Sequence, residues 1–378
     1  MAEPKQQSRS RKGCLICKRR HIKCDEQGPP CANCRVRNLG CFYTEVAESK
    51  DSSEEPSAAP ASTASRRLEL ELFHQWSTDT YRSLIFDGDD ETVWREAIPH
   101  LALDFDYLLN AIFAISALHI SSMSTSSRSK TYQMAALEYQ NLAITAFRNQ
   151  DLLCTSEASH SMCAFSMIQL VLTVAFTSYP DGATKESSIL DHLTVLFNLL
   201  EGTTSIIASA RTSLLNGPLG AFVRQSSHTQ AGPLSPYAQL AFEKLRMLRD
   251  EEYTALSASA TSTLDAASTY ESTSNAIDKL EICFGLRSGN KLVVCFRWFA
   301  TLDAVFVKRI DNLDPLALLV TMHWAILLAN IGKEKWWARS SGKALVADIS
   351  GILSGQRWEW LPIISFVHRE VGLPPSLE

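Results

Sequence analysis

Apolar positions recur along most of the chain at the three- and four-residue spacing of α-helices, and no stretch keeps the two-residue alternation of a β-strand. From Leu68 onward these helical signals continue almost to the end of the chain. Residues 107–120 are apolar on nearly every side, which predicts a helix buried in the core. Asp314 and Pro315 form a cap and first-turn pair for a helix over residues 316–330. The pattern therefore predicts an all-α body.

Capping residues predict where some of these helices end. The acidic run 89–91 can cap a helix that is expected to stop before Pro99. Gly202 stands where a helix over residues 189–200 would take its C-terminal cap. Two polar stretches rich in Ser and Thr are predicted to be loops, namely residues 121–130 and 254–275.

A polar segment separates this body from the N-terminus. Residues 44–65 are rich in Ser, Ala, Pro and Glu and nearly free of large apolar residues, so they cannot bury enough surface to fold. The predicted organisation is a small N-terminal domain with a basic arm over residues 1–45, a flexible linker over 46–66, and an all-helical regulatory domain over 67–378. No heptad run follows the small domain to announce a coiled coil.

Charge separates the two ends of the chain. The 378 residues carry a net charge of −5, yet residues 1–45 hold ten Lys and Arg against four Asp and Glu. A basic head on an acidic body favours a polyanion as the partner of the head. No apolar run reaches the roughly 20 residues needed to span a bilayer, and the first residues lack the apolar segment of a secretory signal. The protein is therefore expected inside the cell, where thiols stay reduced.

Six of the ten cysteines lie close together in the basic head. Their spacing is C-x2-C-x6-C-x6-C-x2-C-x6-C, and a shift of 17 residues carries the first three onto the last three. The six are Cys14, Cys17, Cys24, Cys31, Cys34 and Cys41. Three cysteines per half cannot fill a tetrahedral zinc site, which takes four ligands.

Six thiolates do satisfy two zinc ions if two of them bridge both metals. The internal symmetry favours Cys14 and Cys31 as the bridging pair. One zinc ion would then be held by Cys14, Cys17, Cys24 and Cys31, and the other by Cys31, Cys34, Cys41 and Cys14. Such sites leave no open position for a substrate, so the metal is structural. A segment this short is expected to be unfolded without its metal.

Each C-x2-C is followed by a short helical segment, and the first of these is the more basic. Its residues can reach guanine O6 and N7 in the major groove of DNA, and they are Lys18, Arg19, Arg20, His21 and Lys23. Arg35 and Arg37 in the second half are expected to contact phosphates, which position the protein without specifying a sequence. Ile22 and Leu39 are equivalent under the 17-residue shift and are expected to pack the halves together.

Three simpler interpretations account for less of this segment. A disulfide framework fits the even cysteine count, but the missing secretory signal opposes it. A redox C-x-x-C motif explains one pair and not six cysteines in register. A basic run can be a localisation signal alone. The duplicated spacing favours the zinc cluster over each of these.

Residues 11–43 resemble the fungal Zn2Cys6 binuclear cluster of the yeast galactose regulator family, with every cysteine, the basic stretch after Cys17 and the proline before Cys31 in place. The resemblance implies a nuclear, sequence-specific transcription factor that recruits the transcription machinery. It also implies reading of CGG-like triplets in double-stranded DNA, often by a homodimer on paired half-sites. Base contacts would come from Arg20 and His21. His21 stands where the family more commonly has Lys or Arg.

The body resembles the fungal sterol uptake control regulators over residues 69–81, 93–120 and 314–328 and at the pair Trp336-Trp337. The resemblance implies an all-α domain that binds a sterol or another small apolar ligand. The alternative is that the Leu, Ile, Phe and Trp stripes are simply core. A metabolic or secondary-metabolite gene set and a sterol or lipid gene set both stay open as targets.

The remaining candidate residues predict no catalytic site. His119 and His323 lie in apolar helices and are interpreted as core histidines. Four further cysteines are scattered among apolar residues and are expected to be buried thiols, namely Cys154, Cys163, Cys283 and Cys295. No phosphate loop, nucleophile elbow or H-E-x-x-H motif occurs in the sequence. We therefore expect a protein that is not an enzyme.

Overall fold

The computed structural model describes residues 13–20, 22–28, 30–37, 41, 63–86, 90–149, 156–178, 189–225, 232–258, 263–286, 291–354 and 358–374. The chain divides into two compact units, Met1–Ala61 and Ser62–Glu378. We call them the cysteine unit and the helical body. Every regular element among the described residues is a helix, which confirms the predicted fold class.

The cysteine unit contains two helices of five residues each, α1 (Leu15–Arg19) and α2 (Ala32–Val36). The first half of the helical body contains α3 (Thr63–Gln75), η1 (Trp76–Thr80), α4 (Tyr81–Leu84), η3 (Val93–Ala97), α5 (Ile98–Ala102), α6 (Asp106–Met123), α7 (Ser126–Arg148), α8 (Ser156–Phe176), α9 (Ile189–Ser209), α10 (Arg211–Asn216) and α11 (Gly220–Gln225). The second half contains α12 (Pro236–Ala258), α13 (Thr263–Gly285), α14 (Lys291–Phe299), α15 (Ala304–Asp311), α16 (Pro315–Gly332), η4 (Trp336–Ala338), α17 (Ser341–Leu353), η5 (Trp358–Trp360) and α18 (Leu361–Val371).

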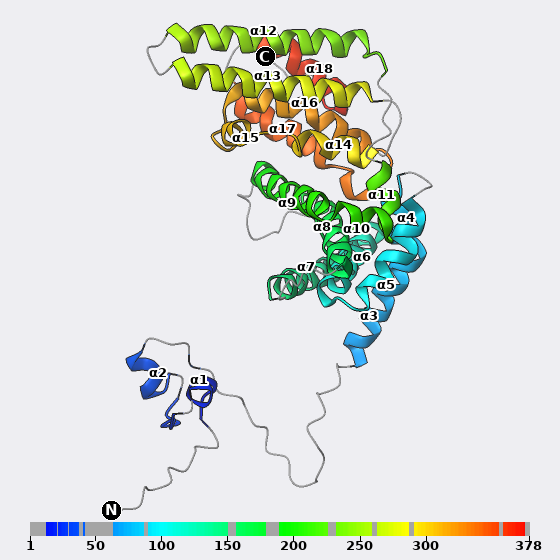
Figure 1. Ribbon diagram of the computed structural model, residues 1–378, viewed down its shortest axis with the longest axis vertical. Coiled ribbons are helices and arrows are strands. Elements are labelled where there is room, and N and C mark those ends of the chain that lie inside the picture. The colour runs from blue at the N-terminus through cyan, green and yellow to red at the C-terminus, as the bar shows by residue number, and fades with distance from the viewer. Residues whose placement is uncertain are drawn as a thin grey trace, which may run out of the picture. The chain divides into compact units, whose positions relative to one another are not determined.

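Two apolar helices organise the body. Helix α6 is buried on nearly every side, as its sequence predicts, and packs against α3, α7 and α8. Helix α16 packs against α14, α17 and α18, while α12 and α13 lie side by side above it (Figure 1). Asp314 caps α16 by accepting a hydrogen bond from the Ala317 N–H at 3.0 Å, and Pro315 occupies the first turn. The predicted cap is therefore confirmed.

Helices α8 and α16 each include a stretch that is long and apolar enough to cross a membrane, over Ala158–Phe176 and Pro315–Gly332. Length and composition alone are weak evidence for a span, because the core helix of a folded domain passes the same test. Within the body, 78% of each stretch is buried against other helices. Both therefore pack as core helices here.

A tryptophan pair joins segments that are some 250 positions apart in the sequence. The Trp336 indole N–H donates to the Ser83 hydroxyl at 3.0 Å, and the Trp337 indole N–H donates to the Ser83 carbonyl at 3.3 Å. The Trp336 ring also stacks on His119, with ring centroids 4.7 Å apart. The short helix η4 thereby ties the C-terminal half of the body to α4 and α6.

Arg309 forms a buried ionic network that joins four helices. Its guanidinium donates to the carboxylates of Glu252 on α12 and Asp314 at the cap of α16, the latter at 2.8 Å. It also donates to the Thr273 hydroxyl on α13. The Arg309 side chain is only 11% exposed. Each buried charge is therefore paired, as burial in an apolar core requires.

Two predicted helix ends are wrong. Helix η3 is a π-helical turn that continues into α5, so Pro99 lies in the first turn of α5 and does not end the helix. Proline is tolerated there because the first N–H groups of a helix make no intrahelical bond. Helix α9 continues through Gly202 to Ser209. The Thr203 hydroxyl beyond the glycine is buried and bonds to the Leu199 carbonyl at 2.6 Å.

The two predicted loops are also wrong, because most of both stretches is helical. Helices α6 and α7 are separated only by Ser124 and Thr125. In the second stretch, the described residues belong to α12 and α13. Their hydroxyl groups bond back to the preceding turn, as the Thr273 hydroxyl does to the Thr269 carbonyl at 2.8 Å. Packing of α12 against α13 then outweighs the weak helix propensity of Ser and Thr.

Helix α3 starts inside the range that the sequence assigned to the linker. Its first residue is Thr63, so residues 63–66 are helical. The rest of the expected linker, residues 46–62, lies outside the described residues.

His323 predicts a pH dependence of stability. The ring is fully buried in α16, and its Nδ1–H donates to the Leu319 carbonyl at 2.7 Å. Burial lowers the pKa of His323 to about 4. Between pH 6.5 and 4 this imidazole therefore binds a proton in the unfolded state but not in the native state. The free energy of unfolding falls as the pH falls through this range. From pH 7 to 5 we expect a loss of about 2 kcal/mol in the free energy of unfolding from this residue.

The measurement is urea unfolding at both pH values followed by tryptophan fluorescence, which reports on the helical body because all eight tryptophans lie there. The variant His323→Leu should lose about 2 kcal/mol less than the wild type over this pH range. The exposed His100→Leu variant serves as the control and should keep the wild-type profile. Equal slopes for the wild type and His323→Leu would show that the buried imidazole does not govern the acid sensitivity.

Candidate metal centre and nucleic-acid interface

The structure brings all six cysteines of the basic head into one buried cluster. No cysteine of this cluster is more than 8% exposed. The sulfur atoms form two groups, and within each group they lie within 4.8 Å of one another. The first group is Cys14, Cys17, Cys24 and Cys31, and the second is Cys14, Cys31, Cys34 and Cys41. The two groups share Cys14 and Cys31, the pair that the sequence symmetry favours as bridges.

The sulfur spacing fits tetrahedral zinc. A regular tetrahedron with Zn–S distances of about 2.3 Å has S–S edges of about 3.8 Å. The shared pair Cys14 and Cys31 has its sulfurs 3.7 Å apart. The Cys17–Cys31 edge of the first group and the Cys14–Cys34 edge of the second are also 3.7 Å. Four sulfurs at tetrahedral spacing are the donor set of a structural zinc site, and here two such sets share an edge.

Backbone N–H groups point at the sulfurs in a pattern that repeats between the halves. The Cys14 N–H donates to the Cys24 sulfur at 3.4 Å, and the equivalent Cys31 N–H donates to the Cys41 sulfur at 3.2 Å. The Cys17 N–H donates to the Cys14 sulfur at 3.4 Å. Hydrogen bonds to an ionised acceptor are stronger than neutral ones. These donors therefore help to offset the negative charge that six thiolates carry beyond two divalent cations.

Protonation links the cluster to its metal. Burial, together with the neighbouring thiols of Cys31 and Cys14, raises the pKa of Cys34 to about 12. Burial likewise raises the pKa of Cys17. Thiols in this position keep their protons at neutral pH unless a cation stabilises the thiolates. Metal binding and folding of the cysteine unit are therefore coupled.

The turn between the halves is held by one carboxylate that the sequence reasoning missed. Asp25, directly after Cys24, accepts a hydrogen bond from the Ala32 N–H at 3.0 Å and so caps α2. The Asn33 side chain adds a second link by donating to the Lys23 carbonyl at 2.9 Å. An Asp seven residues before a short helix is no local capping signal, because the cap forms only once the chain has turned back on itself.

The predicted packing of Ile22 is wrong. Its side chain is 39% exposed, and Leu39, its expected partner, lies outside the described residues. Ile16 is the apolar side chain that packs against the cluster. The reason is that sulfur atoms fill the space between the halves, so no apolar pair is needed there.

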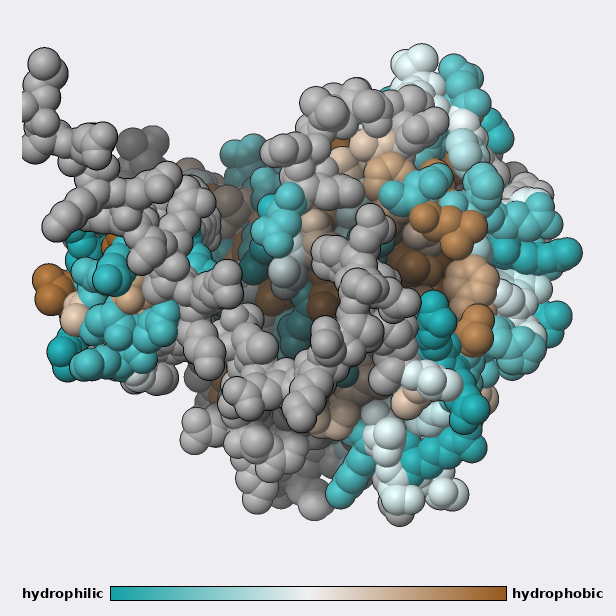
Figure 2. Space-filling view, turned by 90° about the horizontal axis from the view of Figure 1, so that it is seen from below, coloured by the Kyte–Doolittle hydropathy of each residue, from teal (hydrophilic) through white to brown (hydrophobic). Residues whose placement is uncertain are grey.

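The basic side chains that the structure describes in this unit are on its surface. Five of the predicted DNA-binding residues are exposed and form no ion pair within the described part of the unit, namely Lys18, Arg20, Lys23, Arg35 and Arg37. His21 and the Arg19 side chain lie outside what the structure describes. The described surface of the unit is mainly hydrophilic (Figure 2). Charges left unpaired on a rigid metal-organised scaffold are suited to phosphate and base contacts.

The other predicted candidates are not gathered into a site. Burial raises the pKa of Cys163 to about 12 and that of Cys283 to about 11. Cys295 is also buried, so these three thiols are the inert core residues that the sequence predicts, while Cys154 lies outside the described residues. The Nδ1 atom of His119 and the Thr80 hydroxyl share a hydrogen bond of 2.9 Å, so this histidine is a core residue with a partner.

The cysteine unit thus defines a small zinc-organised domain attached to an all-α body. Residues 12–50 match the fungal Zn(2)-Cys(6) binuclear cluster domain. The "Zn(2)-C6 fungal-type transcription factor afumD" of Aspergillus fumigatus is 33% identical over 129 residues, which cover 31% of this chain and 34% of that relative. A "Zn(2)-C6 fungal-type transcription factor" of Gibberella zeae is 22% identical over an alignment that covers 93% of this chain and 85% of that relative.

The chain therefore carries the cluster domain of fungal Zn2Cys6 transcription factors and is similar to proteins of that class beyond it. Its cluster domain binds two zinc ions, which the six cysteines are spaced to hold. These relatives carry the names of transcription factors and not of enzymes. "Sterol uptake control protein 2" of Candida albicans is 51% identical over only 39 residues, 10% of this chain. That alignment is too short to extend over the helical body.

Cys14 belongs to both sulfur groups, whereas Cys24 belongs to one. We therefore expect the variant Cys14→Ala to lose both zinc ions, and Cys24→Ala to retain about one. Zinc per chain is measured by atomic emission on the purified full-length protein. Cys283→Ala, which alters a buried thiol of the helical body, should keep two. If Cys14→Ala retains as much zinc as Cys24→Ala, Cys14 does not bridge the metals.

Proposed function

We propose that the protein is a sequence-specific transcription regulator of the nucleus that reads CGG-like triplets through the zinc-stabilised helix α1. The observation that carries this proposal is the set of unpaired, exposed cations on a scaffold fixed by shared sulfurs. We assign Cys14 and Cys31 to both zinc ions and the four other cluster cysteines to one each. The regulated genes would be a metabolic or secondary-metabolite set, with the transcription machinery as a further partner.

The two halves of the cysteine unit would make different contacts with DNA, the first with bases and the second with phosphates. Lys18 and Arg20 belong to the first, more basic half and are exposed. They would reach base edges. We propose that His21 contacts bases together with Arg20, because of its position in the sequence after Cys17. Arg35 and Arg37 extend from the second half and would hold phosphates.

This division predicts two different losses of DNA affinity. Arg20→Ala should cost about 1–3 kcal/mol on a CGG site and should reduce the preference for CGG over a mutated triplet. Arg35→Ala should weaken binding to both DNAs alike and reduce the slope of log affinity against log salt by about one. Fluorescence anisotropy with labelled duplexes at several salt concentrations measures both effects. Equal loss of preference in the two variants would argue against a reading role for Arg20.

We also propose that the protein acts as a homodimer joined through the start of the helical body. Leu70 on α3 and Leu103 after α5 are 71% and 67% exposed and border an apolar groove. Arg66 and Glu69 also line it. In an antiparallel pair of α3 helices, Arg66 of each copy would face Glu69 of the other, so the surface is complementary to itself.

Leu70→Asp should therefore convert a dimer into a monomer in sedimentation equilibrium, because it places a charge among the apolar side chains of the interface. Met247→Asp, at an exposed apolar position of α12 outside the groove, should leave the dimer intact. A wild-type chain that sediments as a monomer at micromolar concentration would rule out this interface.

A second candidate function is a ligand-sensing regulator of sterol or lipid genes. Its support from relatives is the short match to the Candida albicans protein named for sterol uptake control. Its support from the structure is a cavity in the helical body, lined mainly by apolar residues.

A further inference from the structure

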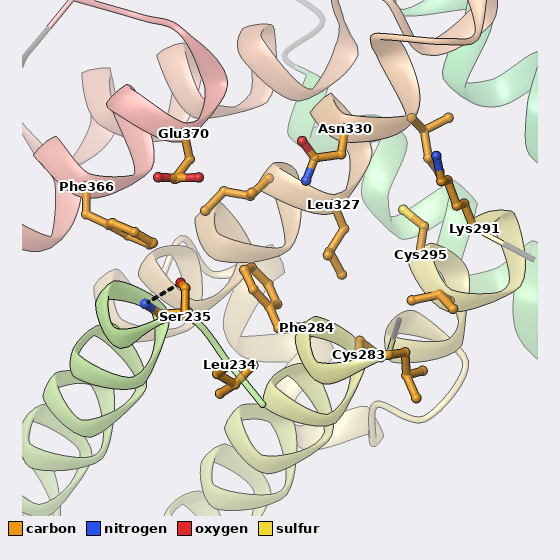
Figure 3. Close-up of a pocket in the computed structure, with 15 residues that line it drawn as sticks. Leu234, Ser235, Cys283, Phe284, Lys291, Cys295, Leu327, Asn330, Phe366 and Glu370 are labelled. Carbon is orange, nitrogen blue, oxygen red and sulfur yellow. Dashed lines mark hydrogen bonds between the residues drawn. The ribbon is translucent and has the colours of Figure 1, made fainter. Parts of the chain in front are cut away.

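A cavity of about 380 Å³ opens among α12, α13, α14, α16 and α18 (Figure 3). Six large apolar side chains line it and remain only partly buried, namely Leu234, Phe284, Leu286, Val294, Leu327 and Phe366. Side chains of this kind normally pack to close density in a protein interior. A concave wall of half-buried apolar groups with a few polar ones is typical of a small-molecule site.

Two aromatic rings project into the cavity from different helices. Phe284 comes from α13 and Phe366 from α18, and in the view of Figure 3 Leu327 of α16 lies beside Phe284, on the side away from Phe366. A flat ring system could contact both rings and the leucine at once. Aromatic contacts of this kind add about 0.5–1.5 kcal/mol each to the burial of apolar surface.

The polar groups at the rim define what the occupant must carry. The Asn330 side-chain oxygen accepts a hydrogen bond from Lys333 at 2.7 Å, which leaves the amide nitrogen as a donor. Figure 3 shows this nitrogen turned toward the cavity. The matching ligand group is a carbonyl or another hydrogen-bond acceptor.

Glu370 supplies the complementary acceptor. Its carboxylate lies at the rim near Phe366 (Figure 3), and its ion pair with Arg369 is long, at 3.8 Å. A carboxylate here favours a hydroxyl donor and repels an anion. Lys291, the cation that lines the cavity, is engaged in an ion pair with Glu334. Arg369 lies over the Phe366 ring, 5.6 Å from its centroid. Both cations near the rim, Lys291 and Arg369, thus already have a carboxylate partner, which disfavours a fatty acid.

We propose that this cavity binds a neutral hydroxylated aromatic molecule of two or three rings. Its ring system lies between Phe284 and Phe366, its carbonyl accepts a hydrogen bond from Asn330, and its hydroxyl donates to Glu370. The cavity volume is near the lower end of the range of about 300–1,000 Å³ for ligand sites, which suits such a molecule better than a four-ring sterol. The proposal concerns the helical body alone and does not depend on how the cysteine unit reads DNA.

The test is isothermal titration calorimetry on the full-length zinc-loaded chain with a hydroxyflavone that is neutral at pH 7. We expect saturable binding that is lost in Leu327→Trp, because the indole fills the cavity. Leu240→Trp is the matched control, since Leu240 is 62% exposed on α12 and does not line the cavity. Circular dichroism and zinc content identify any variant that fails to fold.

A second comparison tests the polar contacts. The wild type should bind the hydroxyflavone about tenfold more tightly than flavone, which lacks the hydroxyl, because a hydrogen bond to a charged group is lost. This preference should disappear in Glu370→Leu, whereas affinity for flavone should change little. Asn330→Leu should weaken both ligands. A loss of folding would lower both affinities together and cannot imitate the selective loss in Glu370→Leu.

Three outcomes would overturn the proposal. The first is no saturable binding of the hydroxyflavone to the wild type, and the second is undiminished binding to Leu327→Trp. The third is binding of ergosterol or dodecanoate without binding of the hydroxyflavone, which would assign the cavity to a sterol or an aliphatic acid. Anisotropy with CGG-containing DNA on the same preparations keeps a failure of this proposal distinct from a failure of DNA reading.

Discussion

The sharing of Cys14 and Cys31 between two groups of four sulfurs is the constraint on which the cysteine unit depends. The unit has almost no hydrophobic core, so its stability has to come from metal–thiolate bonds. Burial raises the pKa of Cys17 and Cys34, so these thiols keep their protons unless a cation is present, which couples folding to metal binding. With the metals at the centre, the chain needs no apolar contact between its halves, and Ile22 is free to lie on the surface. Lys18 of α1 and Arg35 of α2 are thereby left exposed.

The helical body is stabilised by a different balance. Helices α6 and α16 supply large apolar surfaces, and polar side chains on other elements link segments that are distant in the sequence. Arg309 neutralises carboxylates on α12 and at the cap of α16, and the indoles of Trp336 and Trp337 bond to Ser83 across most of the body. These contacts fix the order of the helices. This close packing is interrupted at the cavity among α12, α13, α14, α16 and α18, where the apolar side chains of the lining are only partly buried.

The two units thus suit separate tasks. The zinc-organised unit presents a rigid set of cations to a polyanion, and the body offers a cavity whose polar rim matches a neutral hydroxylated aromatic ligand. The two proposed functions can fail independently, because neither one uses residues of the other unit. An apolar groove at the start of α3 adds a surface by which two copies would come together close to the chain that leads to the cluster.

The sequence by itself determined the cysteine cluster, the all-α class and the cap of α16, because each depends on the spacing of a few residues close in the chain. It did not determine the helices over residues 121–130 and 254–275, where packing overrides the weak helix propensity of Ser and Thr. The cap that Asp25 provides for α2 and the helix that continues past Gly202 likewise need partners outside the local window. Only the tertiary structure brought Phe284, Asn330 and Glu370 to one cavity, since a ligand site built from several helices leaves no spacing signal in any one of them.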